Sequence, residues 1–201
     1  AARLAQSGIV PGAVVTRESI ENAARVLLAI GGSTNGVIHL AAIAGRVGLP
    51  FDLRALNALS DTTPVLVNLK PTGEHYMEDL HAAGGMQAVL QELEALLHTD
   101  CLTVTGERLG DRLRRPRRFV DRAVVRPMSD PFRATGGLVA LFGNLAPNGC
   151  VLKRAAADER LFEHVGRAMV FTALAEISRR IDDPELDVTP DDVLVLQNAG
   201  S

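Results

Sequence analysis

The feature that most constrains this chain is a short polar corner between two apolar segments. Gly31 and Gly32 end one apolar run, and Ser33, Thr34 and Asn35 precede the next. Glycine tolerates positive φ angles and close backbone approach, whereas Ser, Thr and Asn are preferred where a helix begins. The pattern therefore predicts two consecutive helices joined by a tight turn. Free backbone N–H groups and a partial positive charge are expected at the start of the second helix.

Two interpretations of this corner have to be weighed. The ordinary one is a helix–turn–helix connection with no further role, since helix starts of this kind are common. The functional one is a cradle in which the free N–H groups bind a carboxylate or phosphate. The second helix is expected to run to about Gly45 and is almost wholly apolar. Such a helix is predicted to be buried on all sides, which favours the functional interpretation.

Helix-capping residues and apolar spacing predict most elements of the first half. Thr16 is expected to cap a helix over about 17–30, in which apolar residues recur at helical spacing. The apolar run 64–69 has the length and the flanking turns of a buried strand. Further helices are expected at 53–59 (capped by Asp52), 78–81, 86–97 and 109–113.

The pattern changes at an arginine-rich stretch, 112–122, which is expected to be a linker or a solvated edge between domains. Its basic run 114–118 either binds an anion or is solvated surface, and the second is commoner for so short a run. Beyond it, short apolar runs between Gly, Pro and Asn turns indicate strands, with a spacing typical of a barrel or sandwich. The expected strands are 124–125, 138–142, 149–153, 167–171 and 193–196, with one helix at about 173–180.

The composition is that of a soluble globular chain. Hydrophobic residues make up 47% and charged residues 22% of the 201 residues, and the net charge is -3. Neither nucleic acid nor an anionic membrane is therefore expected as a partner. No apolar run approaches the ~20 residues needed to span a bilayer, and the first residues lack a signal-peptide pattern. With only two cysteines, the expected location is the reducing cytoplasm.

Short blocks rich in Gly, Pro and small polar residues follow one another along nearly the whole chain. The first is the corner, Gly31 to Asn35, and the others are Ser60–Leu66, Leu69–Gly73, Met77–Gly85, Leu102–Gly106, Gly136–Leu138, Gly143–Gly149 and Gly166–Ala168. In this order they resemble the dihydroxy-acid and sugar-acid dehydratase (IlvD/Edd) family. Four segments are more similar to the sugar-acid (aldonate) branch than to the enzymes of amino-acid synthesis: 36–40, 44–46, 84–86 and 164–171.

The resemblance implies an α/β fold: the C-terminal part of a large α/β domain, followed by the first strands of a β-barrel domain. The expected division is 1–111 for the first domain, 112–123 for a linker and 124–201 for the second domain. It also implies a hydro-lyase that dehydrates a small-molecule sugar acid to a 2-keto-3-deoxy acid. The alternative is the dihydroxy-acid dehydratase of branched-chain amino-acid biosynthesis. The full-length protein is expected to be a homo-oligomer, as family members generally are.

The resemblance further implies an iron–sulfur cluster on three cysteines, and Mg²⁺ on carboxylates and a modified lysine. The family segments that carry these ligands are not found here. Cys101 and Cys150 lie in separate apolar runs, which favours buried core cysteines over cluster ligands. The chain is therefore expected to be an internal piece of a longer enzyme, inactive alone, with the cofactor ligands outside it. A rival interpretation is a non-catalytic binding or assembly module.

The part that this chain is expected to supply is one wall of a substrate site. Ser33, Thr34 and Asn35 are the candidate substrate-binding residues, and no catalytic or metal-binding residue is assigned.

Other polar residues each have a structural and a functional interpretation. His39 is expected to be a core histidine rather than a base. The histidines and acids between His75 and His81 are close enough in sequence to suggest a metal site, but helix capping and surface packing are favoured. Lys70 is expected to be a solvated turn lysine rather than the partner of a carboxylate.

Overall fold

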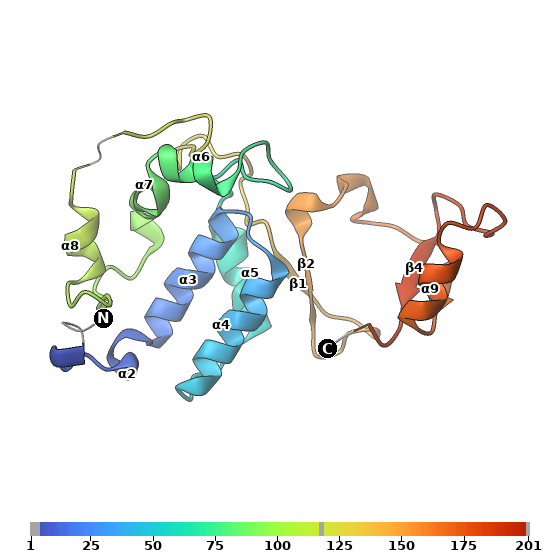
Figure 1. The fold of residues 1–201 in the computed structure, drawn as a ribbon, viewed down its shortest axis with the longest axis horizontal. Helices are drawn as coiled ribbons and strands as arrows, with labels where there is room; N and C mark the ends of the chain where they lie inside the picture. The colour runs from blue at the N-terminus through green and yellow to red at the C-terminus, as the bar shows by residue number, and fades with distance from the viewer. Residues whose placement is uncertain (1–4, 117–118, 200–201) are drawn as a thin grey trace. The chain divides into compact units, whose positions relative to one another are not determined.

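The computed structural model describes residues 5–116 and 119–199, and they form an α/β fold of helices and short strands (Figure 1). The predicted fold class is confirmed. The chain packs into two compact units, Ala1–Ala156 and Ala157–Ser201. In the described segments, no helix is both long enough and apolar enough to cross a membrane.

In the first unit, helices pack around a buried extended segment, and a β-hairpin follows. The helices are α2 (Pro11–Val14), α3 (Arg17–Ala29), α4 (Thr34–Arg46), α5 (Leu53–Thr62), α6 (Met77–Ala82), α7 (Gly85–Glu92), η1 (Glu94–Leu96) and α8 (Leu109–Leu113). The antiparallel hairpin joins β1 (Val139–Leu141) to β2 (Cys150–Leu152), and the 3-10 turn η2 (Arg154–Ala156) comes next. The helix predicted over 86–97 is shorter than expected, because its last part tightens into η1.

Helix α3 begins where the sequence predicts it. Thr16 Oγ1 accepts a hydrogen bond from the Ser19 N–H at 3.3 Å, and Ser19 Oγ accepts one from the Thr16 N–H at 2.9 Å. This reciprocal capping satisfies two backbone donors that a helix start would leave free. The helix then buries Ile20, Ala24 and Leu28, which recur at helical spacing and so form its core-facing side.

The segment 64–69 is the buried centre of the first unit. Val65, Leu66, Val67 and Leu69 are all at most 7% exposed. The Leu66 N–H donates to the Ala29 carbonyl at 2.8 Å. The strand predicted here is wrong as a regular element, since the segment pairs through single bridges, Val65 to Arg133 and Val67 to Val125. Its bridge partners, Arg133, Val125 and His75, belong to separate segments, so no continuous ladder forms along it.

A side-chain amide fixes the hairpin to α5. Asn57 Oδ1 accepts from the Ala140 N–H at 2.7 Å, and Asn57 Nδ2 donates to the Ala140 carbonyl at 2.8 Å. The amide thus makes the two hydrogen bonds that a neighbouring strand would make to β1. Asn22 of α3 holds the backbone of His98 in the same way, with bonds of 2.8 and 3.0 Å.

Helix α4 is buried on one face only. It buries Val37 and Ala44, but Ile38 is 66% exposed and Ile43 48% exposed. The helix packs against α3 on one side, and one such contact covers only one face of a helix. Its apolar outer face therefore stays in contact with solvent in this chain, and the prediction of burial on all sides is wrong.

The second unit is a β–α–β arrangement. Strands β3 (Ala168–Phe171) and β4 (Val193–Leu196) are parallel, and α9 (Leu174–Arg180), which lies between them in sequence, packs against β3. Figure 1 labels α9 and β4. The 3-10 turn η3 (Glu159–Leu161) precedes them. These elements match the predicted runs 167–171, 173–180 and 193–196. The strands of the described residues form two separate pairs, and they close no barrel.

An arginine ties the two parallel strands together at their starts. Arg167 Nη1 lies 2.8 Å from Asp187 Oδ2, and its Nε and Nη2 contact the Asp192 carboxylate at 3.1 and 2.8 Å. The Arg167 guanidinium, and then the Thr189 N–H, hold the pKa of the Asp192 carboxyl well below its usual value. The Gly166–Ala168 block thus has a structural role in the second unit.

Replacement of Asn57 tests the amide link between α5 and the hairpin. Asn57→Ala removes both hydrogen bonds and leaves the buried Ala140 N–H without this partner. The free energy of unfolding in urea should fall by about 1–3 kcal/mol. The exposed Asn148 serves as the control, and Asn148→Ala should change it by less than about 0.5 kcal/mol. Equal effects of the two substitutions would contradict the link.

The Arg167 network predicts an acid-sensitive second unit. Because the pKa of Asp192 is lowered by folding, its stabilisation is present above the ordinary aspartate value of about 4 and is lost as the pH falls further. The protection factors of the β3 and β4 amides, which are corrected for the slower intrinsic exchange in acid, should fall in acid. Arg167→Gln should lower these protection factors already at neutral pH and weaken their dependence on pH. Arg179→Gln on α9 is the control, and an Arg167→Gln profile identical to it would contradict the network.

Candidate functional site

The corner between α3 and α4 is built by a pair of backbone hydrogen bonds. The Gly32 N–H donates to the Leu27 carbonyl at 2.9 Å, and the Gly31 N–H donates to the Leu28 carbonyl at 3.2 Å. Gly31 has φ +60°, the left-handed conformation that ends many helices and that glycine adopts without strain. The glycines therefore cap α3 and reverse the chain, as the sequence predicts.

Ser33 then starts α4. Its Oγ accepts a hydrogen bond from the Asn35 N–H at 3.2 Å, which satisfies one of the free donors at the helix start. Ser33 and Asn35 are exposed and Thr34 is half-buried. The three candidate substrate-binding residues thus lie together at the positive end of a 13-residue helix. Their role as substrate ligands stays a prediction.

The inner side of the corner is packed by segments that lie far from it in the sequence. A Cβ built on the buried Gly31 would lie 3.7 Å from Thr72 Oγ1 and 3.9 Å from Val65 Cγ1. A Cβ built on Gly137 would lie 3.1 Å from the Gly31 Cα. The blocks Ser60–Leu66, Leu69–Gly73 and Gly136–Leu138 therefore meet at the corner. Sequence reasoning missed Thr72 and Gly137 as neighbours of the site, because no local pattern marks such contacts.

The Gly136–Leu138 block is held against α5 by hydrogen bonds to Ser60. Ser60 Oγ donates to the Leu138 carbonyl at 2.7 Å, and the Gly136 N–H donates to the Ser60 carbonyl at 2.8 Å. Arg154 Nη2 adds a hydrogen bond of 3.0 Å to the Gly136 carbonyl. Ser60 is fully buried, so these bonds form out of water, where breaking them leaves polar groups unsatisfied.

The polar cluster between His75 and His81 has a structural role. Asp79 Oδ2 accepts from the Tyr76 N–H at 2.8 Å at the start of α6, and His75 Nδ1 lies 3.7 Å from the same oxygen. The favoured interpretation, helix capping, is confirmed for Asp79. Lys70 is exposed, and its Nζ donates to the Tyr76 hydroxyl at 2.6 Å.

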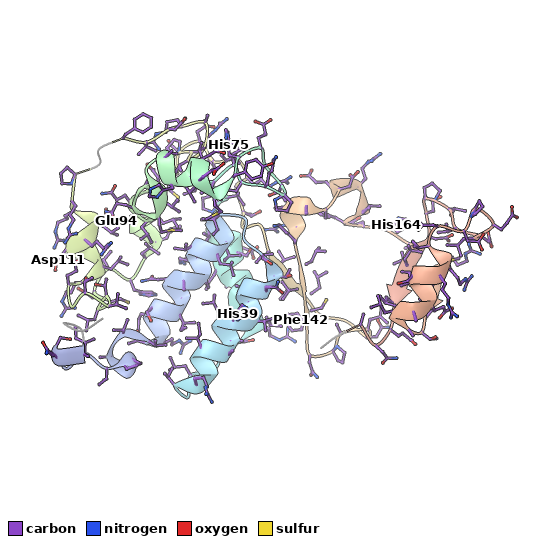
Figure 2. All side chains as sticks on the ribbon, viewed as in Figure 1. His39, His75, Glu94, Asp111, Phe142 and His164 are labelled. Atoms are coloured by element: carbon purple, nitrogen blue, oxygen red, sulfur yellow. The ribbon has the colours of Figure 1, made fainter. Side chains whose placement is uncertain are left out.

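The predicted burial is wrong for two residues, His39 and Cys150. His39 lies on the exposed side of α4 rather than in the core (Figure 2), because α4 is covered on one face only. Cys150 is exposed, because β2 belongs to a two-stranded hairpin that is only partly covered. Cys101 is half-buried beside Asn22, and burial, followed by the charge of Glu18, raises the pKa of its thiol.

The basic run after α8 is engaged with nearby acids. Arg115 contacts Glu107 at 2.5 Å, and Arg114 is hydrogen-bonded to Asp111. Both arginines are exposed, which agrees with the interpretation of this run as solvated surface. The rest of the run, Arg117 and Arg118, lies outside the described residues. In the segments 5–116 and 119–199, no three His, Cys, Asp or Glu side chains are grouped so that they could hold a metal ion.

Comparison with known proteins gives the same family along the whole chain. The model of the dihydroxy-acid/6-phosphogluconate dehydratase N-terminal domain matches residues 1–112, and that of the C-terminal domain matches residues 123–201. L-arabonate dehydratase of Azospirillum brasilense is 44% identical over 200 residues, which are 98% of this chain and 34% of the relative. Dihydroxy-acid dehydratase of Caldicellulosiruptor bescii is 42% identical over 199 residues, 98% of this chain and 36% of the relative. This chain spans about a third of the length of these curated relatives.

Two glycine substitutions test the geometry of the corner. Gly31→Ala places a side chain at positive φ and should lower the free energy of unfolding by about 1–2 kcal/mol. Gly45 lies in α4 with open space around a built Cβ, so Gly45→Ala should raise the same free energy by about 0.5–1 kcal/mol. Urea unfolding followed by circular dichroism measures both. If the two variants shift stability in the same direction, the assigned cap is incorrect.

Proposed function

The chain belongs to the dihydroxy-acid/6-phosphogluconate dehydratase family, and from this membership we propose that it forms part of a hydro-lyase that dehydrates a sugar acid. The substrate is an aldonate, a 2,3-dihydroxy acid. A base removes the proton on C2, the bond from C3 to its hydroxyl breaks, and the departing hydroxyl takes up a proton and leaves as water. The resulting enol takes up a proton at C3 and becomes a 2-keto-3-deoxy acid.

The aldonate branch is our preference within the family. Its support is the similarity of the segments 36–40, 44–46, 84–86 and 164–171 to sugar-acid dehydratases. Relatives named for L-arabonate and for dihydroxy acids match this chain at 44% and 42% identity. The alternative substrate is therefore the dihydroxy acid of branched-chain amino-acid biosynthesis. The alternative of another class is a non-catalytic binding or assembly module.

The observation that carries the proposal for this chain is the geometry of the corner. Ser33, Thr34 and Asn35 stand at the start of α4, where helix N–H groups and the helix dipole favour a carboxylate. Asn35 donates its backbone N–H to Ser33 Oγ, and the residue is exposed to solvent. We assign these residues to the binding of the acid, its carboxylate or a neighbouring hydroxyl, and not to proton transfer.

The iron–sulfur cluster and Mg²⁺ that the family implies do not fit the donors of this chain. Three thiolates would be needed for the cluster, and the chain has two cysteines, one half-buried and one exposed. No acidic group of the described residues is arranged as a metal site. We therefore derive no step through either group, and their ligands are proposed to lie outside this chain.

We also propose a division of the chain between two domains. We assign residues 1–111 to the end of an α/β domain, 112–123 to a linker, and 124–201 to the opening strands of a β-barrel domain. The whole protein is proposed to be a cytoplasmic homo-oligomer that acts on a small molecule.

A substrate panel tests the proposed function. A polypeptide of the relatives' length that carries this chain should turn over at least one of arabinonate, xylonate and gluconate, with 2,3-dihydroxyisovalerate as the competing substrate. Release of the 2-keto acid measures the rate. Turnover of 2,3-dihydroxyisovalerate alone would move the protein to the other branch. No turnover of any of the four would favour the non-catalytic module.

The role of the corner has its own variant. Asn35→Ala should raise KM for the acid by about tenfold, since it removes a contact made in both ground and transition states, with little change in kcat. Asn148→Ala, at another exposed asparagine, is the control. Unchanged KM in Asn35→Ala would remove Asn35 from the site.

A further inference from the structure

We propose that Gly137 is a positioning residue for the acid-binding corner, acting through the backbone of Gly31. The inference rests on the proposed function, because it takes Ser33 to Asn35 as the substrate wall. Gly137 belongs to the part of the chain that matches the C-terminal family domain, whereas the corner belongs to the part that matches the N-terminal one. A residue of one family segment would therefore set the geometry of a site in the other.

The first observation is a backbone contact that is tight for an added methyl group, so that a neighbouring atom must give way. A Cβ on Gly137 would lie 3.1 Å from the Gly31 Cα, 3.3 Å from the Ala155 Cβ and 3.7 Å from the Val65 Cγ2. The atom on Gly31 is backbone, so it moves only if the whole turn moves. Gly31 is the residue at which the chain reverses, and Ser33 is two residues further on.

The second observation is a shared hydrogen-bond acceptor. The Leu28 carbonyl accepts from the Gly31 N–H at 3.2 Å as part of the α3 cap, and it also accepts from the Gly137 N–H at 3.4 Å. The same carbonyl is thus hydrogen-bonded both to the turn and to the Gly136–Leu138 block. A displacement of Gly137 acts on the cap directly.

The third observation is that Gly137 itself is held in place. Its carbonyl accepts from the Ala155 N–H at 3.1 Å, and the preceding Gly136 is bound to both Ser60 and Arg154. Gly136 and Gly137 are buried. Because the block is fixed on one side, a methyl group on Gly137 pushes against the corner rather than retreating from it.

The expected effect is a change in binding geometry. A shift of the turn by a few tenths of an ångström re-aims the first N–H groups of α4 together with Ser33 and Asn35. Small misplacements of this kind are enough to weaken a bound ligand severalfold. Because the corner is assigned to binding, the change should appear in KM.

The test is steady-state kinetics of Gly137→Ala in a polypeptide of the relatives' length, with whichever acid the parent turns over. KM should rise by about tenfold while kcat changes by less than about twofold. Gly143→Ala is the matched control in the same segment, since a built Cβ there meets nothing within 4 Å. It should leave both constants unchanged. A purely structural role for Gly137 would reduce the amount of active enzyme and leave KM as it is, and that result would overturn the inference.

A double variant separates the two close contacts of the added methyl group. Gly137→Ala combined with Ala155→Gly relieves the contact with Ala155 and keeps the contact with Gly31. KM should stay raised in the double variant. Recovery of the parent KM would show that the effect passes through Ala155, and it would contradict the inference.

Amide spectra of the 201-residue chain keep the inference testable apart from the reaction. Gly137→Ala should shift the amide signals of Gly31, Gly32 and Asn35, whereas Gly143→Ala should not. If the parent has no turnover, the proposed function fails, and these signals alone test whether Gly137 positions the corner. Unshifted corner signals in Gly137→Ala would overturn the positioning role.

Discussion

The geometry of the candidate site depends on how the backbone ends α3. The two hydrogen bonds from Gly31 and Gly32 to the carbonyls of the last helical turn reverse the chain, and they require a left-handed residue at position 31. Where the next helix begins, and where its free N–H groups point, follows from this reversal. A residue with a side chain at position 31 would strain the turn by about 1–2 kcal/mol, and the start of α4 would move.

The chain holds its irregular segments with backbone and amide hydrogen bonds rather than with a large sheet. Asn57 and Asn22 each hydrogen-bond to the backbone N–H and C=O of one distant residue. Ser60 hydrogen-bonds to the Gly136–Leu138 block. These hydrogen bonds are partly or fully buried, so the loss of one partner leaves a buried polar group unsatisfied and lowers the stability of the fold. Since only 3% of the residues are aromatic, the packing between these bonds is aliphatic, and the polar links are what fixes one loop relative to another.

Local features of the sequence were sufficient for the positions of most helices, but not for the strand predicted at 64–69 or for the contacts between distant elements. Thr16 and Asp52 mark two helix starts correctly, and of the three capping candidates at the corner Ser33 is the one that starts α4, because capping is decided by neighbouring residues. The contact of Gly137 with Gly31 joins distant parts of the chain, so no local pattern indicates it. The burial of α4 was predicted wrongly for a related reason: apolar residues show that a face can be covered, but coverage depends on what packs there. His39 was predicted to lie in the core for the same reason, and it is exposed.

The most direct measurement is a crystal structure of the active polypeptide with an unreacted aldonate bound. The carboxylate, or the hydroxyl next to it, should lie within hydrogen-bond distance of the groups of Ser33, Thr34 and Asn35 at the start of α4. An aldonate bound in the active site with water, and no substrate atom, against these three residues would show that the corner does not bind the acid.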